Sequence, residues 1–228
     1  MPNLIMIYFG QLLLKSQRLK ETFITTCLEG VPSLFLGSQL RSWLYQLILN
    51  KVSRSTYIQE GVELLGCHSI SLGNSVSLFK GVRVDARGLG NAVVLDDNTS
   101  LQRGVDIRAL NQTRIHVGNY SFIGPYTCLA GPGDIEIGNH CSIASHCGIF
   151  ANDHKFDDPT RGPNDQGLTR QGIVIEQECW IGHGVSILDG VRVGKGSVVG
   201  AGSVILRDIP PMSVAVGIPA RVIKKRGN

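Results

Sequence analysis

Residues 175–205 read IEQECWIGHGVSILDGVRVGKGSVVGAGSVI, and this stretch decides the fold. An aliphatic residue returns at every sixth position, at Ile175, Ile181, Ile187, Val193, Val199 and Ile205. A small residue follows four positions after each of the first five, at Cys179, Val185, Val191, Ser197 and Ser203. A period of six matches neither the helical repeat nor simple strand alternation. It is typical of a hexapeptide β-helix, in which three short strands form one triangular coil and successive coils stack.

The same period occurs earlier in the chain, in groups of three aliphatic residues. These groups are Leu72, Leu78 and Val84; Leu95, Leu101 and Ile107; Val117, Ile123 and Leu129; and Ile137, Ile143 and Ile149. With the terminal stretch they predict an all-β parallel β-helix of about six coils over residues 61–210.

The pattern breaks on the third side of each early coil. The position four after the third aliphatic holds Gly88, Asn111, Gly133 or Asp153 instead of an aliphatic core residue. We therefore expect the extra residues to leave each coil at the same edge of the prism. The largest departure is a polar insertion at 151–173, and a loop of this length in a compact repeat is usually functional.

Residues 1–60 differ from the repeat and predict a helical N-terminal extension. Leu36, Leu40, Trp43 and Leu47 recur at helical spacing after Pro32-Ser33, and residues 4–20 predict a second helix. The first interpretation is a cap on the open end of the β-helix, and the alternative is peripheral membrane contact through residues 1–50. Residues 211–228 are expected to form a C-terminal tail.

Composition narrows the functional classes. The 28 glycines and an aromatic content of 6% fit a turn-rich repeat with an aliphatic interior. The net charge is +4, and no stretch of basic residues alternates with aromatic residues, which argues against nucleic-acid binding. The six cysteines show no zinc-type spacing, so no metal is expected, and reduced thiols in a cytoplasmic protein are the simplest interpretation. We recognise no signal peptide, and the apolar run at 4–14 is too short to span a bilayer.

His154 is the one histidine of the 151–173 insertion. Imidazole titrates near neutrality and is the usual general base, although a lone loop histidine is often a bystander. Asn152 and Asp153 stand next to it and are candidate substrate-binding residues.

Several C-terminal motifs carry a resemblance to a known family. They are Trp180-Ile181-Gly182, Gly190-Val191-Arg192-Val193-Gly194, Val199-Gly200-Ala201-Gly202-Ser203-Val204, Arg207-Asp208-Ile209-Pro210 and Gly217-Ile218-Pro219-Ala220-Arg221. Together with the loop histidine they resemble the hexapeptide-repeat acetyltransferases, in the branch of maltose, galactoside and polysaccharide O-acetyltransferases. The close resemblance covers about residues 137–226.

The resemblance implies a left-handed β-helix, a homotrimer, and acetyl-CoA bound between subunits as the acyl donor. It implies that His154 is the catalytic base, that a backbone N–H in the Gly182–Gly184 turn stabilises the oxyanion, and that Trp180 lies along the pantetheine arm. The other cofactor-binding residues it implies are Gly182, His183, Ala201, Arg207, Arg221 and Lys224. Without the resemblance, Trp180 would be an exposed corner aromatic and the three cations ordinary surface charges.

The expected activity is transfer of acetyl to a sugar hydroxyl in a polysaccharide or its lipid-linked precursor. The resemblance does not determine the identity of the acceptor sugar, because Gly124 stands where the galactoside branch has an asparagine that binds the sugar.

Three alternatives remain. Arg83-Val84-Asp85 and Ser100-Leu101-Gln102 resemble a γ-class carbonic anhydrase, but Arg108, Ser145 and Phe150 stand at its metal-ligand positions. The second alternative is a non-catalytic β-helix scaffold. The third is a serine acetyltransferase, whose helical domain and paired aspartate and histidine are not recognisable here.

Overall fold

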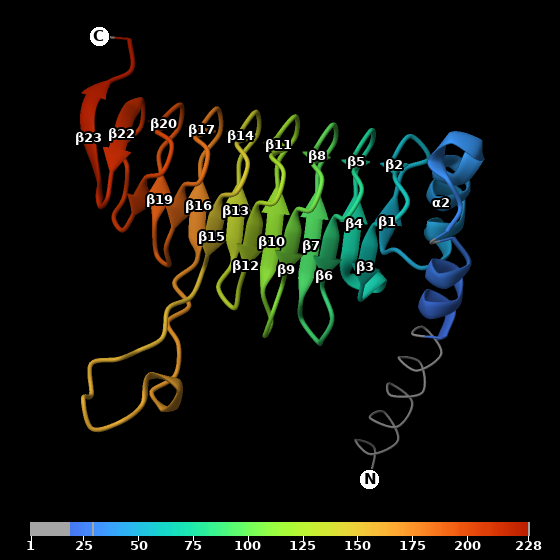
Figure 1. Ribbon diagram of the computed structural model, residues 1–228, viewed down its shortest axis with the longest axis horizontal. Coiled ribbons are helices and arrows are strands. Elements are labelled where there is room, and N and C mark those ends of the chain that lie inside the picture. Colours follow the sequence, from blue (N-terminus) through green and yellow to red (C-terminus); the bar gives the residue numbers. More distant parts are fainter. Residues whose placement is uncertain (1–18, 29, 228) are drawn as a thin grey trace.

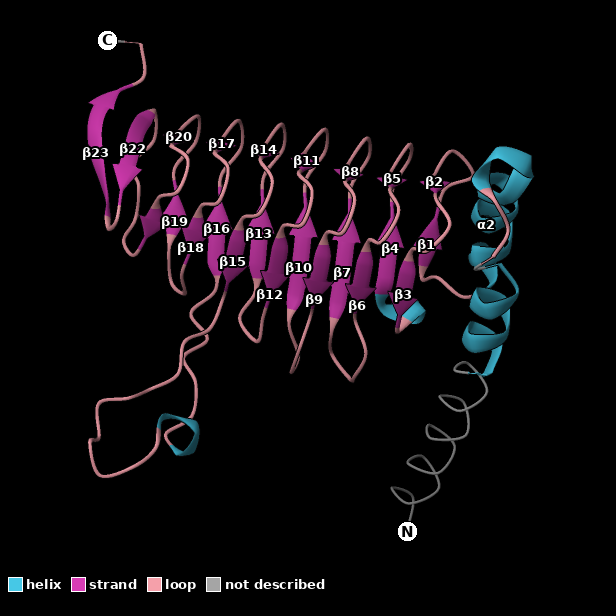
Figure 2. Cartoon of the chain, viewed as in Figure 1, coloured by secondary structure: helices cyan, strands magenta, loops and turns pink. Residues whose placement is uncertain are grey.

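The computed structural model describes residues 19–28 and 30–227. These residues form a left-handed parallel β-helix with helices at one end and a β-hairpin at the other (Figure 1). Each coil contributes three short strands, and equivalent strands of successive coils pair in parallel. The three sides of the prism are therefore three sheets, named A, B and C here (Figure 2).

The strands of each sheet follow in chain order. Sheet A contains β1 (Lys51–Val52), β4 (Ile70–Leu72), β7 (Ala92–Leu95), β10 (Arg114–Val117), β13 (Ile135–Ile137), β16 (Ile173–Ile175) and β19 (Arg192–Val193). Sheet B contains β2 (Tyr57–Ile58), β5 (Ser77–Leu78), β8 (Ser100–Leu101), β11 (Phe122–Ile123), β14 (Ser142–Ile143), β17 (Trp180–Ile181), β20 (Val198–Val199), β22 (Ser213–Gly217) and β23 (Ala220–Lys225). Sheet C contains β3 (Glu63–Leu65), β6 (Arg83–Asp85), β9 (Asp106–Arg108), β12 (Cys128–Ala130), β15 (Gly148–Phe150), β18 (Ser186–Ile187) and β21 (Val204–Ile205).

The described residues contain seven coils, so the expected number of six is corrected. The additional coil is the first one, β1 to β3, and β1 and β2 lie inside the range 1–60 that was expected to be helical. Its inward residues Val52, Ile58 and Leu64 also follow the period of six. The triplet is hard to recognise because it directly follows a helical segment that is also rich in aliphatic residues.

The core is a stack of aliphatic side chains in register. Ile143 pairs with Ile181, and Ile181 pairs with Val199, so the same inward position repeats from coil to coil. All three are buried, and each side chain of this kind stabilises the fold by about 1.5–3 kcal/mol. Cys141 and Cys179 occupy the small inward positions as buried free thiols.

Helices cover the end of the prism at β1 (Figure 1). Residues 19–28 are helical, and a π-helical turn η1 (Ser33–Gly37) leads into α2 (Ser38–Leu44) and a 3-10 turn η2 (Tyr45–Leu47). Leu28, Tyr45 and Leu49 are buried in the core cluster. The helix predicted for residues 4–20 falls almost wholly outside the described residues.

α2 differs from the amphipathic helix predicted from Leu40 and Trp43, because these two side chains are exposed whereas Arg41 is buried. Its side chain is only 1% exposed. The guanidinium donates hydrogen bonds to the carbonyl oxygens of Leu28 (3.0 Å), Ile58 (3.4 Å) and Val31. Leu28 and Val31 belong to the N-terminal helical region and Ile58 to β2, so one buried cation with several donors satisfies carbonyl groups on both sides of this contact.

The connections from sheet C to the next strand of sheet A all lie on one edge, which we call the C–A edge. The connections in the early coils are 86–91, 109–113 and 131–134, and the longest is 151–172. This confirms that the extra residues leave the coils at one edge. The longest connection projects well away from the prism (Figure 1).

A hairpin ends the prism at its C-terminal side. β22 pairs in parallel with β20, and β23 pairs antiparallel with β22. The segment expected to be a tail therefore extends sheet B.

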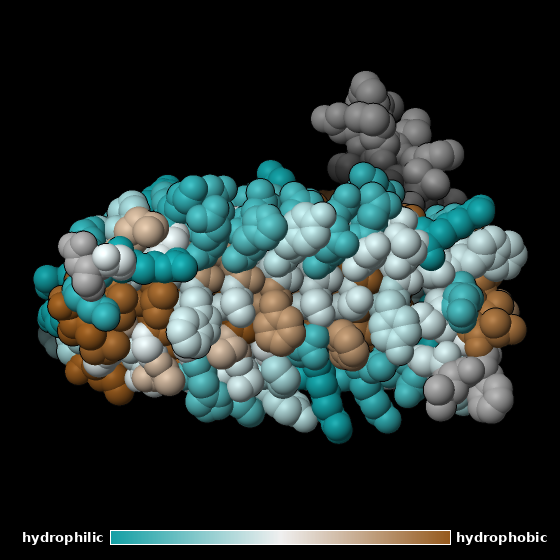
Figure 3. Space-filling view, turned by 90° about the horizontal axis from the view of Figure 1, so that it is seen from above, coloured by the Kyte–Doolittle hydropathy of each residue, from teal (hydrophilic) through white to brown (hydrophobic). Residues whose placement is uncertain are grey.

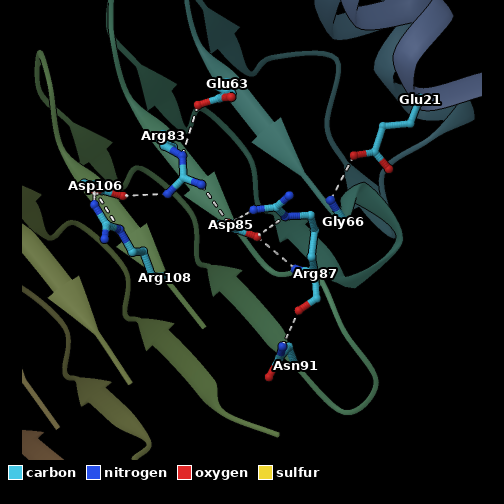
Figure 4. A network of polar contacts seen from close by, with 9 residues as sticks. All are labelled: Glu21, Glu63, Gly66, Arg83, Asp85, Arg87, Asn91, Asp106 and Arg108. Atoms are coloured by element: carbon cyan, nitrogen blue, oxygen red, sulfur yellow. Dashed lines mark hydrogen bonds and ion pairs between the residues drawn. The ribbon is translucent and has the colours of Figure 1, made fainter. Parts of the chain in front are cut away.

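A charged network ties together the first three coils on sheet C (Figure 4). Arg83 bonds to Glu63 (3.0 Å), Asp85 (2.8 Å) and Asp106 (3.4 Å). Burial alone would raise the pKa of the Asp85 carboxyl, but Arg87 and Arg83 bind it and lower its pKa overall. This part of sheet C is a structural network, because its charges satisfy one another.

Candidate active site

His154 lies at the base of the long loop on the C–A edge. The Thr169 amide donates to the Asp153 carbonyl oxygen (2.8 Å), and His154 forms an antiparallel bridge with Leu168. These contacts fix the backbone of His154 while its side chain is exposed. An accessible imidazole on a fixed backbone is suited to proton transfer with a bound molecule.

Carboxylates surround the base of the loop. Partial burial and the negative charge of Asp189 both raise the pKa of Asp153. Asp189 accepts hydrogen bonds from the amides of Gln171 (3.0 Å) and Gly172 (2.9 Å), where the loop rejoins β16. Arg170 also anchors the loop, because its Nε donates to the Pro132 carbonyl oxygen (2.8 Å). Asn152 and Asp153 thus lie beside His154 on an anchored segment.

Trp180 begins β17 on sheet B, and its side chain is 57% exposed. The backbone pairs with Ser142 on one side and Val198 on the other. The strand alternation that buries Ile181 therefore directs the indole ring outward. An exposed flat ring of this size offers stacking area to a ligand.

The turn after β17 lies on the edge between sheets B and C, which we call the B–C edge. A β-carbon at Gly182 would lie 2.7 Å from the Ala201 amide nitrogen, so the close approach of coils 6 and 7 requires glycine here. The Gly184 amide donates to the Ser145 carbonyl oxygen (3.0 Å). Within the part of the chain that the structure describes, the His183 amide donates no hydrogen bond. It is therefore free to bind an oxygen atom of a ligand.

The three predicted phosphate-binding cations are exposed. Arg221 and Lys224 lie on β23, whereas Arg207 follows β21 on the C–A edge. Among residues 19–28 and 30–227, none of the three forms an ion pair. Unpaired cations can bind phosphate groups.

The predicted site residues fall into two groups on different sides of one chain. Trp180, Gly182, His183 and Ala201 lie together on sheet B and the B–C edge of coils 6 and 7. His154 belongs to the loop on the C–A edge. This loop projects from the side of the prism opposite sheet B (Figure 1). Within one chain the structure does not bring His154 and Trp180 together.

Sequence reasoning missed a pair of residues on the B–C edge. One residue of this turn has positive φ in every coil, and in five coils it is glycine: Gly61, Gly81, Gly104, Gly184 and Gly202. Coils 4 and 5 carry Tyr126 (φ 58°) and His146 (φ 59°) instead. A residue with a β-carbon in this conformation costs roughly 1–2 kcal/mol. The break in the glycine pattern could have been recognised in the sequence.

The two rings stack on one another. Their centroids are 5.2 Å apart with an interplanar angle of 24°, and His146 meets His183 edge to face at 5.4 Å. The Ser145 hydroxyl lies 2.9 Å from His183 Nδ1. A β-carbon at Gly104 would lie 2.5 Å from the Tyr126 ring, so glycine in coil 3 makes room for it.

The surface cavities lie elsewhere. A cavity of about 340 Å³ near the N-terminal helices is lined by Glu21, His68 and Arg87, among others. Another of about 360 Å³ lies along the C–A edge between Arg87 and Arg170. We prefer the B–C edge as the candidate site on chemical grounds, since neither cavity combines a free backbone donor with an exposed aromatic ring. In the described residues no three His, Cys, Asp or Glu side chains converge as metal ligands. No helix described here has the length and apolarity needed to cross a membrane.

Comparison with known proteins identifies relatives over most of the chain. A model of the bacterial transferase hexapeptide (six repeats) matches residues 172–207. The chain is 32% identical to the putative lipopolysaccharide biosynthesis O-acetyl transferase WbbJ of Escherichia coli, over 69% of this chain and 72% of the relative. It is 38% identical to the probable acetyltransferase Rv3034c of Mycobacterium tuberculosis, over 54% of this chain and 43% of that protein. Several other curated relatives are matched over about half of their length.

Solved structures share the fold. The polySia specific acetyltransferase NeuO superposes with a TM-score of 0.58 at 27% identity, covering 76% of this chain and 88% of NeuO. The N-acyltransferase AntD of Bacillus cereus, solved with dTDP and 3-hydroxybutyryl-CoA, superposes with a TM-score of 0.55 at 22% identity, covering 82% and 88%.

Proposed function

The chain belongs to the hexapeptide-repeat acetyltransferases, and from that premise we propose that it transfers acetyl from acetyl-CoA to a sugar hydroxyl. WbbJ is named as an O-acetyl transfer enzyme of lipopolysaccharide biosynthesis, and NeuO as an acetyltransferase specific for polySia. Both names support a glycan acceptor, and the O-acetyl transfer in the name of WbbJ supports a hydroxyl nucleophile. The acceptor is accordingly proposed to be a polysaccharide or its lipid-linked precursor.

The free His183 amide is the observation that carries this proposal. The thioester carbonyl of acetyl-CoA would lie against this amide, which would donate to the oxygen as negative charge develops on it. Trp180, exposed beside the turn, supports a pantetheine arm running along sheet B. Ala201 leaves room for that arm, since its side chain is small and exposed, and Gly182 lets coils 6 and 7 approach closely beside it.

His154 is the proposed general base. Its imidazole would take the proton from the acceptor hydroxyl while the oxygen attacks the thioester carbonyl carbon. Collapse of the tetrahedral intermediate breaks the carbon–sulfur bond, and the proton passes from His154 to the departing thiolate of coenzyme A. General-base catalysis of this kind contributes about a hundredfold or more to the rate.

The separation of the two residue groups supports a homotrimer with sites between subunits. His154 of one subunit would meet Trp180 and His183 on the B–C edge of its neighbour, because one chain carries the groups on different sides. Arg221 and Lys224 on β23 are proposed to bind the nucleotide phosphates of acetyl-CoA. Arg207, on the C–A edge, would join them only from the subunit that supplies His154.

We propose a cytoplasmic site of action with peripheral membrane contact. Large apolar side chains of the N-terminal helical region are exposed, among them Phe23 (71%) and Trp43 (59%). Exposed aromatic and aliphatic side chains of this kind bind the interfacial region of a bilayer. Such contact would suit a lipid-linked acceptor.

Release of free thiol from acetyl-CoA tests the function. The purified protein is incubated with acetyl-CoA and a panel of sugars, beside His154→Ala and the matched control His140→Ala. We expect acceptor-dependent release that falls by about a hundredfold or more in His154→Ala and is unchanged in the control. Equal release by all three proteins would exclude His154 from the chemistry. Failure to bind acetyl-CoA would favour the scaffold alternative.

A further inference from the structure

The rings of Tyr126 and His146 on the B–C edge stack on one another at positions where the other coils carry no side chain. The fold itself favours glycine at these two places, as the five other coils show. The positive φ of a tyrosine and a histidine disfavours the folded state, and residues held in this way cluster at functional sites. Coil 3 also carries Gly104 directly under the Tyr126 ring, where a β-carbon would not fit. Coils 4 and 5 thus depart from the glycine pattern together, and Gly104 of coil 3 leaves room for the Tyr126 ring.

We propose that Tyr126 and His146 form a stacking platform that holds one sugar ring of the acceptor beside the His183 turn. The inference rests on the proposed function and deepens it, because it assigns acceptor recognition to this chain's own residues. The platform would determine which saccharides are acetylated and would leave acetyl-CoA binding unaffected.

Position supports the platform. Coils stack about 4.8 Å apart, so the two rings lie about 5 and 10 Å from the turn that holds the His183 amide. The His146 ring is in edge-to-face contact with the His183 ring at 5.4 Å. A pyranose stacked on the platform would therefore present a hydroxyl group close to the proposed thioester position.

Chemistry favours a saccharide as the occupant. The Tyr126 side chain is 51% exposed, and the C–H face of a sugar ring packs against the electron-rich face of an aromatic ring. Polar groups border the rings, since Ser145 and His183 lie next to them and can bond to sugar hydroxyls. The face seen from above has hydrophilic margins and separate hydrophobic side chains along its middle, and its largest hydrophobic patch lies at the end that carries β22 and β23 (Figure 3).

The chain also provides a matched control. Tyr120 and His140 stack in the same way on the edge between sheets A and B, with centroids 5.0 Å apart and an interplanar angle of 1°. Residues with side chains at positive φ are usual on that edge, as Ser75 shows. The Tyr120 pair lies across sheet B from His183, so it is not expected to contact the acceptor.

The test compares Tyr126→Gly with Tyr120→Gly. Tyr126→Gly restores the residue that the fold favours, so it should remain folded. We expect its acceptor KM to rise by about tenfold, as for the loss of one stacking contact, with an unchanged KM for acetyl-CoA and an unchanged oligomeric state. Tyr120→Gly should match the wild type in all three. An unchanged acceptor KM, an equal rise in both variants or a changed oligomeric state in Tyr126→Gly would overturn the platform.

A binding experiment separates this inference from the proposed function. The wild type and both variants are applied to an array of immobilised mono- to hexasaccharides without acetyl-CoA. Saccharide binding by the wild type and by Tyr120→Gly that is lost in Tyr126→Gly supports the platform, whether or not acetyl transfer occurs. Absence of binding by all three proteins, or equal binding by all three, would overturn it even if the wild type is an active acetyltransferase.

Discussion

Replacing His116 by glutamine is expected to destabilise the protein in a pH-dependent manner. His116 on β10 lies between two carboxylates of neighbouring coils, with Nε2 2.8 Å from Asp96 and Nδ1 2.5 Å from Glu136. Partial burial of the ring lowers its pKa, but the hydrogen bonds and charges of Glu136 and Asp96 outweigh burial and raise the pKa overall. The imidazolium thus connects three coils across sheet A.

The magnitude follows from two partly exposed ion pairs. Each contributes about 0.5–1 kcal/mol, so together they stabilise the folded state by about 1–2 kcal/mol. Because the folded-state pKa is raised, this stabilisation is fully present below the unfolded pKa of about 6.5 and is lost as pH rises through the higher folded-state pKa. A neutral imidazole can donate to only one of the two carboxylates.

Urea unfolding at equal protein concentration measures the effect, because assembly would otherwise shift the apparent stability. His116→Gln should lower the free energy of unfolding by about 1–2 kcal/mol near pH 6 and by less than half of that near pH 9. Arg114→Gln is the matched control, since Arg114 is exposed on the same strand. A loss that is independent of pH, or larger at high pH, would refute the account of His116.

Three further predictions concern the termini and the core. Arg41→Met should lower the free energy of unfolding by about 3 kcal/mol in urea titrations, since it leaves buried carbonyl groups without donors; a loss near zero would contradict the buried contacts. The exposed Cys27 should react quickly with a thiol reagent, whereas Cys147, whose pKa burial raises, should react only on unfolding; equally fast labelling would contradict its burial. Phe23→Glu with Trp43→Glu should reduce co-sedimentation with anionic lipid vesicles, and unchanged co-sedimentation would exclude this surface.

The coils were predictable because the interior of the prism has a strict geometry. An aliphatic side chain every six residues is needed wherever three short strands close one coil, so Ile181 and Val199 could be recognised in the sequence alone. The first coil was overlooked although Val52 and Ile58 follow the same period. Here the local pattern was ambiguous, because the aliphatic residues of the adjoining helix lie directly before it.

The end of the prism was less predictable. A charged residue such as Arg41 is normally expected on the surface, and only the carbonyl groups that meet at this end explain its burial. That arrangement depends on contacts between segments distant in the sequence, which periodicity does not report.

The residues of the candidate site were easier to predict from the sequence than their arrangement in space. His154 and Trp180 could be singled out from the loop and the motifs. The two residues lie on different sides of one chain because His154 belongs to a connection on the C–A edge and Trp180 precedes a turn on the B–C edge. Assigning a connection to an edge requires the number of residues in every preceding coil. Tyr126 was missed because a tyrosine in a turn looks unremarkable until the glycines of the other coils are aligned with it.

Subunit mixing tests most directly the claim that the site is shared between subunits. His154→Ala removes the proposed base, and Ala201→Trp fills the proposed acetyl-CoA groove, so each variant alone should be nearly inactive. Co-expressed in equal amounts, they should recover about a quarter of wild-type activity, because about one site in four then combines His154 from one subunit with an open groove from its neighbour. Activity no higher than that of either variant alone would contradict a site built between subunits.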